Sequence, residues 1–219
     1  MNTNIPQDPK EIKEQLLEVC RDVYAGFIHG CGVVKEFFDA REREVNPSLA
    51  ANIARYEARE FLHQKRNLLT HYLLENANNN GIAIRQDLYQ IKVLKGMDGQ
   101  PPCPSKARRS ERFYSQGQPL LFKDMFKPWR SADWDLFVSN TAKLNLILCW
   151  EVDKSYSITR LQMMAPRQAW KYGQSVKLFW RQLIQHPASG IAIADLNQAD
   201  DELEDLEIFF DEDAETGDE

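Results

Sequence analysis

The chain has 219 residues and a mass of 25.4 kDa, which suits one large domain or two small ones. Its 43% hydrophobic content excludes disorder throughout, and the lack of any apolar run approaching ~18 residues excludes an ordinary transmembrane helix. The formal net charge of -6 indicates only an acidic, hydrated protein until the positions of the charges are considered.

The first predicted helix begins at Pro9. Asp8 suits the N-cap, Pro9 suits the first helical turn, and Glu11 completes an Asp-x-x-Glu capping box. Apolar residues then recur at spacings of three and four from Ile12 to Phe38. Because glycines interrupt this stripe, it predicts either one helix with a weak middle or two helices.

A second long helix is predicted to start at Asn46 and Pro47, which repeat the cap-then-proline pattern. Its apolar face extends through Leu73. We expect the segment 76–81 to end this helix, because Asn and Gly tolerate the left-handed conformation found beyond a helix C-terminus.

The middle of the chain changes from a helical to a mixed periodicity. Alternate apolar residues predict a strand over 88–94, and the turn-rich residues 96–105 predict a loop. Residues 106–130 lack a clear period, so we expect an irregular segment there, with a short strand at 120–122.

A β-hairpin is the clearest local prediction. The run 144–152 places alternate apolar side chains on one side, and residues 155–164 read as the returning strand, which Pro166 should end. Beyond the hairpin, the spacing of apolar residues predicts a helix over 175–184. Residues 190–194 predict a last strand.

Together these elements predict an α+β fold, with long N-terminal helices packed on a small, mostly antiparallel sheet and one further C-terminal helix. We divide the chain into a helical part, 1–80, an α+β part with a basic loop and the hairpin, 81–197, and a disordered acidic tail, 198–219. The first two parts are expected to form one domain. Like charges along the tail repel and must stay hydrated, which excludes an ordinary packed helix.

Cysteine usage and the start of the chain favour a cytoplasmic location. The four cysteines are too few and too scattered for a disulfide scaffold, and no CxxC pair is present for a structural zinc. No basic and apolar regions of a secretory signal open the chain. We expect reduced thiols at Cys20, Cys31, Cys103 and Cys149.

Positive and negative charges are segregated along the sequence. Residues 200–219 hold twelve carboxylates and no Lys or Arg, so the tail carries -12, while 27 basic and 21 acidic side chains remain and give the body +6. Within the body, residues 81–130 hold ten basic against four acidic side chains. The body is therefore cationic despite the acidic total.

The basic segment is the candidate nucleic-acid site. Clustered Lys and Arg attract phosphate backbones through counterion release, and aromatic side chains among them stack on bases. We expect contacts to DNA or RNA from Lys106, Arg108, Arg109, Arg112, Lys123, Lys127, Trp129 and Arg130. The alternative interpretation is that these side chains only solvate an exposed loop.

The acidic tail contains a small apolar cluster, Leu206, Ile208, Phe209 and Phe210. Acidic residues with interspersed hydrophobes are typical of a linear segment that docks onto a basic protein partner. The tail also imitates a polyanion, so it should compete with nucleic acid for the body and suppress nonspecific contacts. A tail that serves only solubility is the alternative to both roles.

Residues Gln118 to Phe122 resemble the short peptide by which bacterial replication and repair proteins bind the sliding clamp. Gln118, Leu121 and Phe122 match its pattern, whereas Pro119 replaces the usual aliphatic residue. The resemblance covers five of the 219 residues and implies a clamp as an alternative partner.

Few residues favour catalysis. The chain has no GxSxG, no Gly-rich phosphate loop and no HExxH, and the Glu60–His63 ExxH pair lacks the second pair of a two-metal bundle. Glu151 and Asp153 remain, because Mg²⁺-dependent nucleases hold their metal with an Asp and a Glu beside a Lys, here Lys154.

The sequence therefore predicts a non-enzymatic intracellular protein associated with nucleic acid, with a regulatory or recruiting acidic tail and no cofactor, bound metal or membrane partner. A protein–protein adaptor that acts through the tail is the first alternative. A metal-dependent nuclease is the second.

Overall fold

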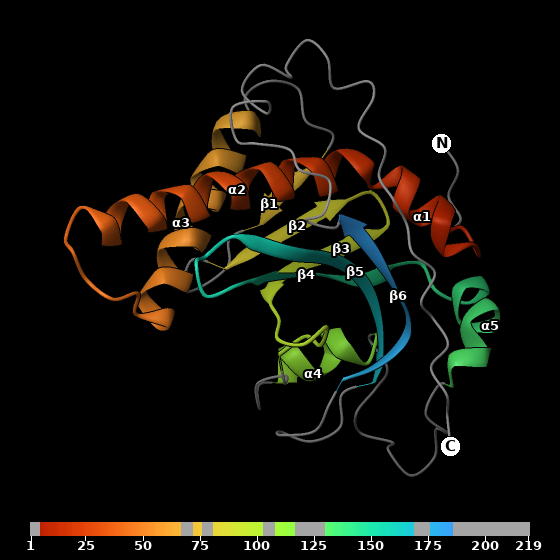
Figure 1. Ribbon diagram of the computed structural model, residues 1–219. Helices are drawn as coiled ribbons and strands as arrows, with labels where there is room; N and C mark the ends of the chain where they lie inside the picture. Colours follow the sequence, from red (N-terminus) through yellow and green to blue (C-terminus); the bar gives the residue numbers. More distant parts are fainter. Residues whose placement is uncertain are drawn as a thin grey trace.

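The computed structural model describes residues 5–66, 72–75, 81–102, 108–116, 130–168 and 176–185. They form helices and a six-stranded, mostly antiparallel sheet, which confirms the predicted α+β class. In Figure 1, α2 and α3 lie across one face of the sheet and α4 lies against the other. None of the helices within these ranges is long and apolar enough to cross a membrane.

The N-terminal stripe folds as two helices, α1 (Pro9–Gln15) and α2 (Leu17–Asp39), separated at Leu16. The predicted cap is confirmed, because the Asp8 carboxylate accepts a hydrogen bond from the Lys10 N–H at 2.8 Å. The next helix, α3 (Pro47–Arg66), is also capped as predicted: the Asn46 side chain accepts from the N–H groups of Ser48 and Leu49.

Gly26 and Gly30 of α2 are packing positions and not weak points. A Cβ on Gly30 would overlap the Ala54 carbonyl of α3, and one on Gly26 would lie 3.1 Å from the Ala58 carbonyl oxygen. Ala54 and Ala58 are fully buried. Small residues on both helices therefore let the two backbones approach closely.

The second predicted helix ends earlier than expected. The helix, α3, ends at Arg66. Leu73–Glu75 forms strand β1 instead, which pairs with β2 (Ile82–Gln86). Tyr72, just before β1, is buried and donates a hydrogen bond from its hydroxyl to Asp22 of α2 at 2.9 Å. This tertiary pairing overrides the helical spacing of the leucines.

The sheet has the strand order β1-β2-β3-β4-β5-β6. Neighbouring strands are antiparallel except β3 (Tyr89–Lys95) and β4 (Leu144–Val152), which are parallel. The connection between this pair carries α4 (Arg108–Tyr114), the short 3-10 helix η2 (Ser131–Asp133) and α5 (Trp134–Ser139). β3 confirms the predicted strand, whereas β2 was not predicted and α4 replaces part of the expected irregular segment.

The predicted hairpin is confirmed as β4 and β5 (Ile158–Gln168). Two details were wrong. Pro166 does not end β5, because the strand continues past it through a register shift. The expected C-terminal helix over 175–184 is strand β6 (Lys177–Gln185), which pairs with β5.

Two groups of buried side chains form the core. The larger lies between the sheet and α2 and α3, and includes Phe27 against Trp150 with ring centroids 4.2 Å apart. The smaller lies beneath α4. Cys20 and Cys31 belong to the first group and Cys149 to the second, and all three are free thiols as predicted. Residues 120–122, 190–194, Cys103 and the acidic tail lie outside the described residues.

Candidate functional site

The two faces of the sheet differ in chemistry. On β2 and β3 the buried residues Ile82, Ile84, Ile91 and Val93 point toward α2 and α3. Strand alternation places the intervening residues on the opposite side, which we call the α4 face. The α4 face carries Arg85, Gln90, Lys92, Asn145, Ile147, Cys149, Glu151, Arg160, Gln162, Met164 and Arg181.

Apolar contacts hold α4 against the middle of this face. Phe113 and Tyr114 are buried with Ile147 and Met164. Just after the helix, the Gln116 side chain donates to the carbonyls of Asn145 (2.9 Å) and Pro166 (2.6 Å). Its own oxygen accepts from the Asn145 N–H at 2.9 Å, so the amide ties α4 to both β4 and β5.

Basic side chains surround this apolar centre. Arg85 is exposed on β2, and Lys92 of β3 lies over the Phe113 ring at 4.0 Å. Arg112 is exposed on the outer side of α4, and no acidic partner within 4 Å accompanies it among the described residues. Basic groups from separate elements therefore gather on one side of the molecule.

The far half of the α4 face is polar and covered by a tight turn. Asp98 and Gly99 both have positive φ, 54° and 73°, which is the two-residue turn that Asp-Gly favours. The Gly99 N–H donates to the Glu151 carboxylate at 2.6 Å. A Cβ on Gly99 would lie 2.9 Å from the Arg160 guanidinium, which the flexible arginine could relieve, so the positive φ is what favours glycine here.

Charges beneath this turn are partly balanced. Arg160 lies 3.8 Å from the Glu151 carboxylate. Arg181 of β6 lies beneath the same turn, near Gly99. On the other half of the face Glu75 accepts from Gln90 at 3.3 Å. Among the described residues of the α4 face, with α4 included, basic side chains outnumber these carboxylates.

The predicted nucleic-acid residues are only partly within the described chain. Arg108, Arg109 and Arg112 belong to α4, and Arg130 precedes η2. The Arg130 side chain is 81% exposed and pairs with Asp133 at 3.5 Å, and this carboxylate reduces the positive potential around the guanidinium. The predicted residues outside the described ranges are Lys106, Lys123, Lys127 and Trp129, with Leu206, Ile208, Phe209 and Phe210 of the tail.

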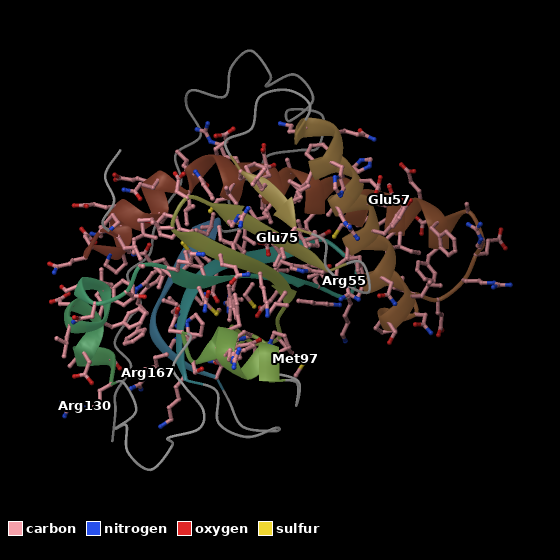
Figure 2. The ribbon with its side chains drawn as sticks, turned by 180° about the vertical axis from the view of Figure 1, so that it is seen from behind. Arg55, Glu57, Glu75, Met97, Arg130 and Arg167 are labelled. Carbon is pink, nitrogen blue, oxygen red and sulfur yellow. The ribbon has the colours of Figure 1, made fainter. Side chains whose placement is uncertain are left out.

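Hydrogen bonds from Arg130 hold the Asp133 carboxylate. The Arg130 backbone N–H donates at 2.8 Å, and the pKa of Asp133 is lowered by that bond first and by the nearby guanidinium groups. Figure 2 shows Arg130 near Arg167 on the side of the sheet where α4 and Met97 lie.

Four basic residues of the α4 face were not among the predicted site residues, namely Arg85, Lys92, Arg160 and Arg181. The signal was available for Lys92, because it alternates with the apolar residues of the predicted strand 88–94. Arg181 had no such signal, since its segment was assigned to a helix.

Glu151 and Asp153, the candidate metal ligands, hold two different turns. The Glu151 carboxylate accepts from the Gly99 N–H of the Asp98–Gly99 turn. Asp153 lies in the β4–β5 turn, where it accepts from the Ser155 hydroxyl (2.7 Å) and the Ser157 N–H (2.8 Å). No group of three or more possible metal ligands occurs in the part of the chain that the structure describes. These contacts account for both carboxylates without a metal.

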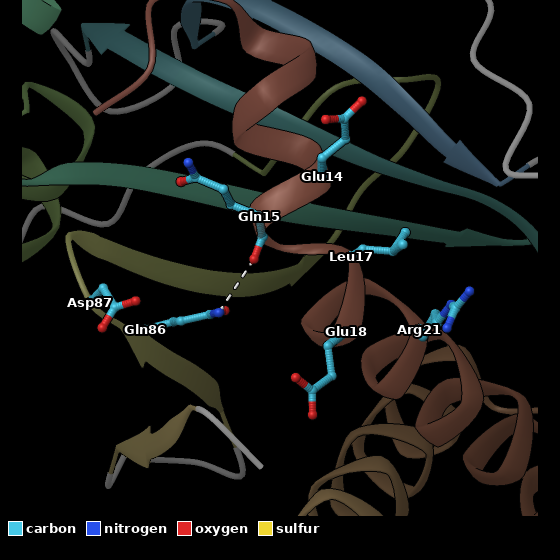
Figure 3. Close-up of a pocket in the computed structure, with 7 residues that line it drawn as sticks. All are labelled: Glu14, Gln15, Leu17, Glu18, Arg21, Gln86 and Asp87. Atoms are coloured by element: carbon cyan, nitrogen blue, oxygen red, sulfur yellow. Dashed lines mark hydrogen bonds between the residues drawn. The ribbon is translucent and has the colours of Figure 1, made fainter. Parts of the chain in front are cut away.

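A shallow depression of about 540 Å³ lies where α1 meets α2 beside the β2–β3 turn. Its lining includes three carboxylates, Glu14, Glu18 and Asp87, and one cation, Arg21. Figure 3 shows these side chains spread around the rim, with the Gln86 amide donating to the Gln15 carbonyl at 3.3 Å. The lining offers no convergent set of polar groups comparable with the α4 face.

Compared with protein-family models, curated proteins and solved structures, the chain gives no match in any of the three.

Proposed function

We propose that the protein is a non-enzymatic nucleic-acid-binding protein that uses the α4 face of the sheet. The observation that carries this proposal is the gathering of Arg85, Lys92 and Arg112 from two strands and a helix on the side opposite α2 and α3. Phosphate backbones are recognised by such an array through counterion release.

We propose that the α4 face contacts the phosphate backbone of the nucleic acid and does not read a particular base sequence. The charged groups surround an apolar centre occupied by α4, and Phe113 and Tyr114 are buried there and not available for stacking. A surface of this kind supplies affinity that depends on salt and little discrimination among sequences.

The acidic tail, 200–219, is proposed to regulate this surface. Its twelve carboxylates oppose a body of charge +6, so the tail competes with nucleic acid for the same cations. Competition of this kind weakens nonspecific contacts more than tight ones.

Fluorescence anisotropy with labelled single-stranded DNA, duplex DNA and RNA tests this function. The full chain and a chain ending at Asn197 are compared from low to physiological salt. The proposal expects tighter binding after truncation and an affinity that falls linearly with salt on logarithmic axes. Absence of a salt-dependent affinity in both chains would contradict it.

The same experiment separates the adaptor role. If truncation leaves nucleic-acid affinity unchanged, the tail does not compete with nucleic acid. Its apolar cluster, Leu206, Ile208, Phe209 and Phe210, is then the recruiting element. A tail peptide that retrieves one basic partner would support that role.

A further inference from the structure

A second group of cations lies on the other side of the sheet, where α2 and α3 meet the β4–β5 turn. It consists of Lys35 of α2, Arg55 of α3 and Lys95 at the end of β3, and we call it the Lys35–Lys95 cluster. Figure 2 shows Arg55 where α3 meets the end of the sheet. The cluster is separate from the α4 face.

Two adjacent residues of the turn hold the two lysines. The Lys95 ammonium donates to the Tyr156 hydroxyl at 3.1 Å, and the Lys35 ammonium donates to the Ser157 hydroxyl at 2.8 Å. Tyr156 is itself fixed, because its hydroxyl donates to the Pro47 carbonyl at 3.0 Å. The turn therefore brings both ammonium groups to one end of the sheet.

The cluster has an excess of hydrogen-bond donors. Each ammonium carries three donors, and one on each lysine is used by a neutral hydroxyl. Within the described chain, no carboxylate lies within 4 Å of Lys35, Arg55 or Lys95. Asp153 of the same turn accepts from Ser155 and Ser157. Against the opposing effect of burial, the pKa of Asp153 is lowered by those bonds first and then by the positive charge of Lys35, so it balances that lysine only in part.

The environment of Lys95 shows that the cations affect one another. Burial lowers the pKa of Lys95, and the positive charge of Arg55 lowers it further. The ammonium also lies 4.8 Å from the Tyr156 ring and 5.6 Å from the Trp150 ring. Half-buried cations of this kind are costly without a compensating anion.

We propose that the Lys35–Lys95 cluster binds a phosphate group, either as free phosphate or as a phosphomonoester. Phosphate supplies several strong acceptor oxygens and about two negative charges, which match the unused donors of both lysines. This site is independent of the nucleic-acid function proposed for the α4 face.

Phosphate titration of the full chain tests the site. Thermal unfolding and phosphorus NMR line broadening are followed as inorganic phosphate replaces sodium chloride at constant ionic strength. We expect a saturable rise in the unfolding temperature with phosphate. We expect Lys35→Gln and Lys95→Gln each to raise the phosphate dissociation constant about tenfold, as for a lost charge-assisted hydrogen bond. Lys143→Gln, which removes an exposed lysine elsewhere, should change nothing.

Lys35→Gln keeps the test valid if Lys95→Gln does not fold, since Lys35 lies on α2, whereas Lys95 pairs with Trp150 within the sheet. Equal stabilisation by chloride, or an unchanged dissociation constant in folded Lys35→Gln, would overturn the proposal. Oligonucleotides with and without a 5′-phosphate then distinguish the source. Tighter binding of the phosphorylated form that is lost in Lys35→Gln indicates a nucleic-acid end, and equal binding excludes that source and leaves free phosphate or a small phosphomonoester.

Discussion

Gly30 of α2 lies directly against the backbone of Ala54 in α3, so close that a side chain at position 30 would overlap the Ala54 carbonyl. Gly30→Ala should therefore lower the free energy of unfolding by about 1–3 kcal/mol, as overpacking does. The intrinsic helix preference for alanine opposes this loss by up to about 1 kcal/mol. Urea unfolding measures the change.

Gly32 provides the matched control, because no atom lies within 4 Å of a Cβ at that position. Gly32→Ala should stabilise the protein by about 0.5–1 kcal/mol through helix propensity alone. If both alanine variants are equally stable, α2 and α3 do not approach as described.

The buried hydrogen bond between Tyr72 and Asp22 is the second point to test. Removal of the hydroxyl in Tyr72→Phe leaves the Asp22 carboxylate with Lys65 at 3.5 Å. We expect a loss of about 1.5–3 kcal/mol in unfolding free energy, because hydrogen bonds to charged groups are the strong ones. Tyr56→Phe, at an exposed position of α3, should be nearly neutral in the same assay. A neutral Tyr72→Phe would show that β1 is not joined to α2 in this way.

Lys13 makes stability depend on pH in the alkaline range. Burial, with repulsion from Lys10, lowers the pKa of Lys13 from 10.5 to about 8. Between these values the unfolded chain binds more protons than the folded one, so stability rises with pH, by at most about 1.4 kcal/mol per unit. In urea unfolding from pH 7 to 10, Lys13→Met should flatten this rise and Lys143→Met should not. A wild-type stability that falls smoothly across the range would contradict the assignment.

Three of the thiols should be unreactive in the folded protein. Burial raises the pKa of Cys20, Cys31 and Cys149 to about 12, which leaves almost no thiolate at neutral pH. Alkylation at pH 7.5, located by mass spectrometry, should spare these three and modify them after denaturation. Rapid modification of Cys149 in the native protein would indicate that α4 and the turn from Gly96 to Gln100 do not cover it.

The elements with a clear local signal, a helix cap or a regular apolar alternation, were predictable from the sequence. β4 alternates apolar and mixed positions, and α1 and α3 begin with Asp8 and Asn46 caps that the structure retains. Local spacing was sufficient for these elements.

β6 was not predictable in this way, because apolar residues at and just before its start pack on both faces of the sheet. Val176 and Leu178 pack beneath α4, while Phe179 and Ile184 join the main core. Register shifts beside Pro166 also disturb the alternation, so the apolar spacing resembles that of a helix. Arg181 can be placed on the α4 face only when its segment is known to be a strand paired with β5.

The candidate site was therefore only partly predictable. Charge counting located the basic segment and Arg112, but side chains from different strands meet only once the sheet order is known. Arg85 and Lys92 become neighbours because β2 and β3 pair in a register that joins Ala83 to Lys92.

The salt dependence of nucleic-acid affinity in a charge-neutralised variant tests the central claim most directly. In the full chain, Arg85→Gln, Lys92→Gln and Arg112→Gln are combined and compared with Arg41→Gln, Arg43→Gln and Arg59→Gln on the helical side. The α4-face variant should bind more weakly and lose roughly 2–3 units of the logarithmic salt slope, since each phosphate contact supplies about 0.7–0.9. Equal slopes for the two variants would contradict the proposal that the α4 face is the binding surface.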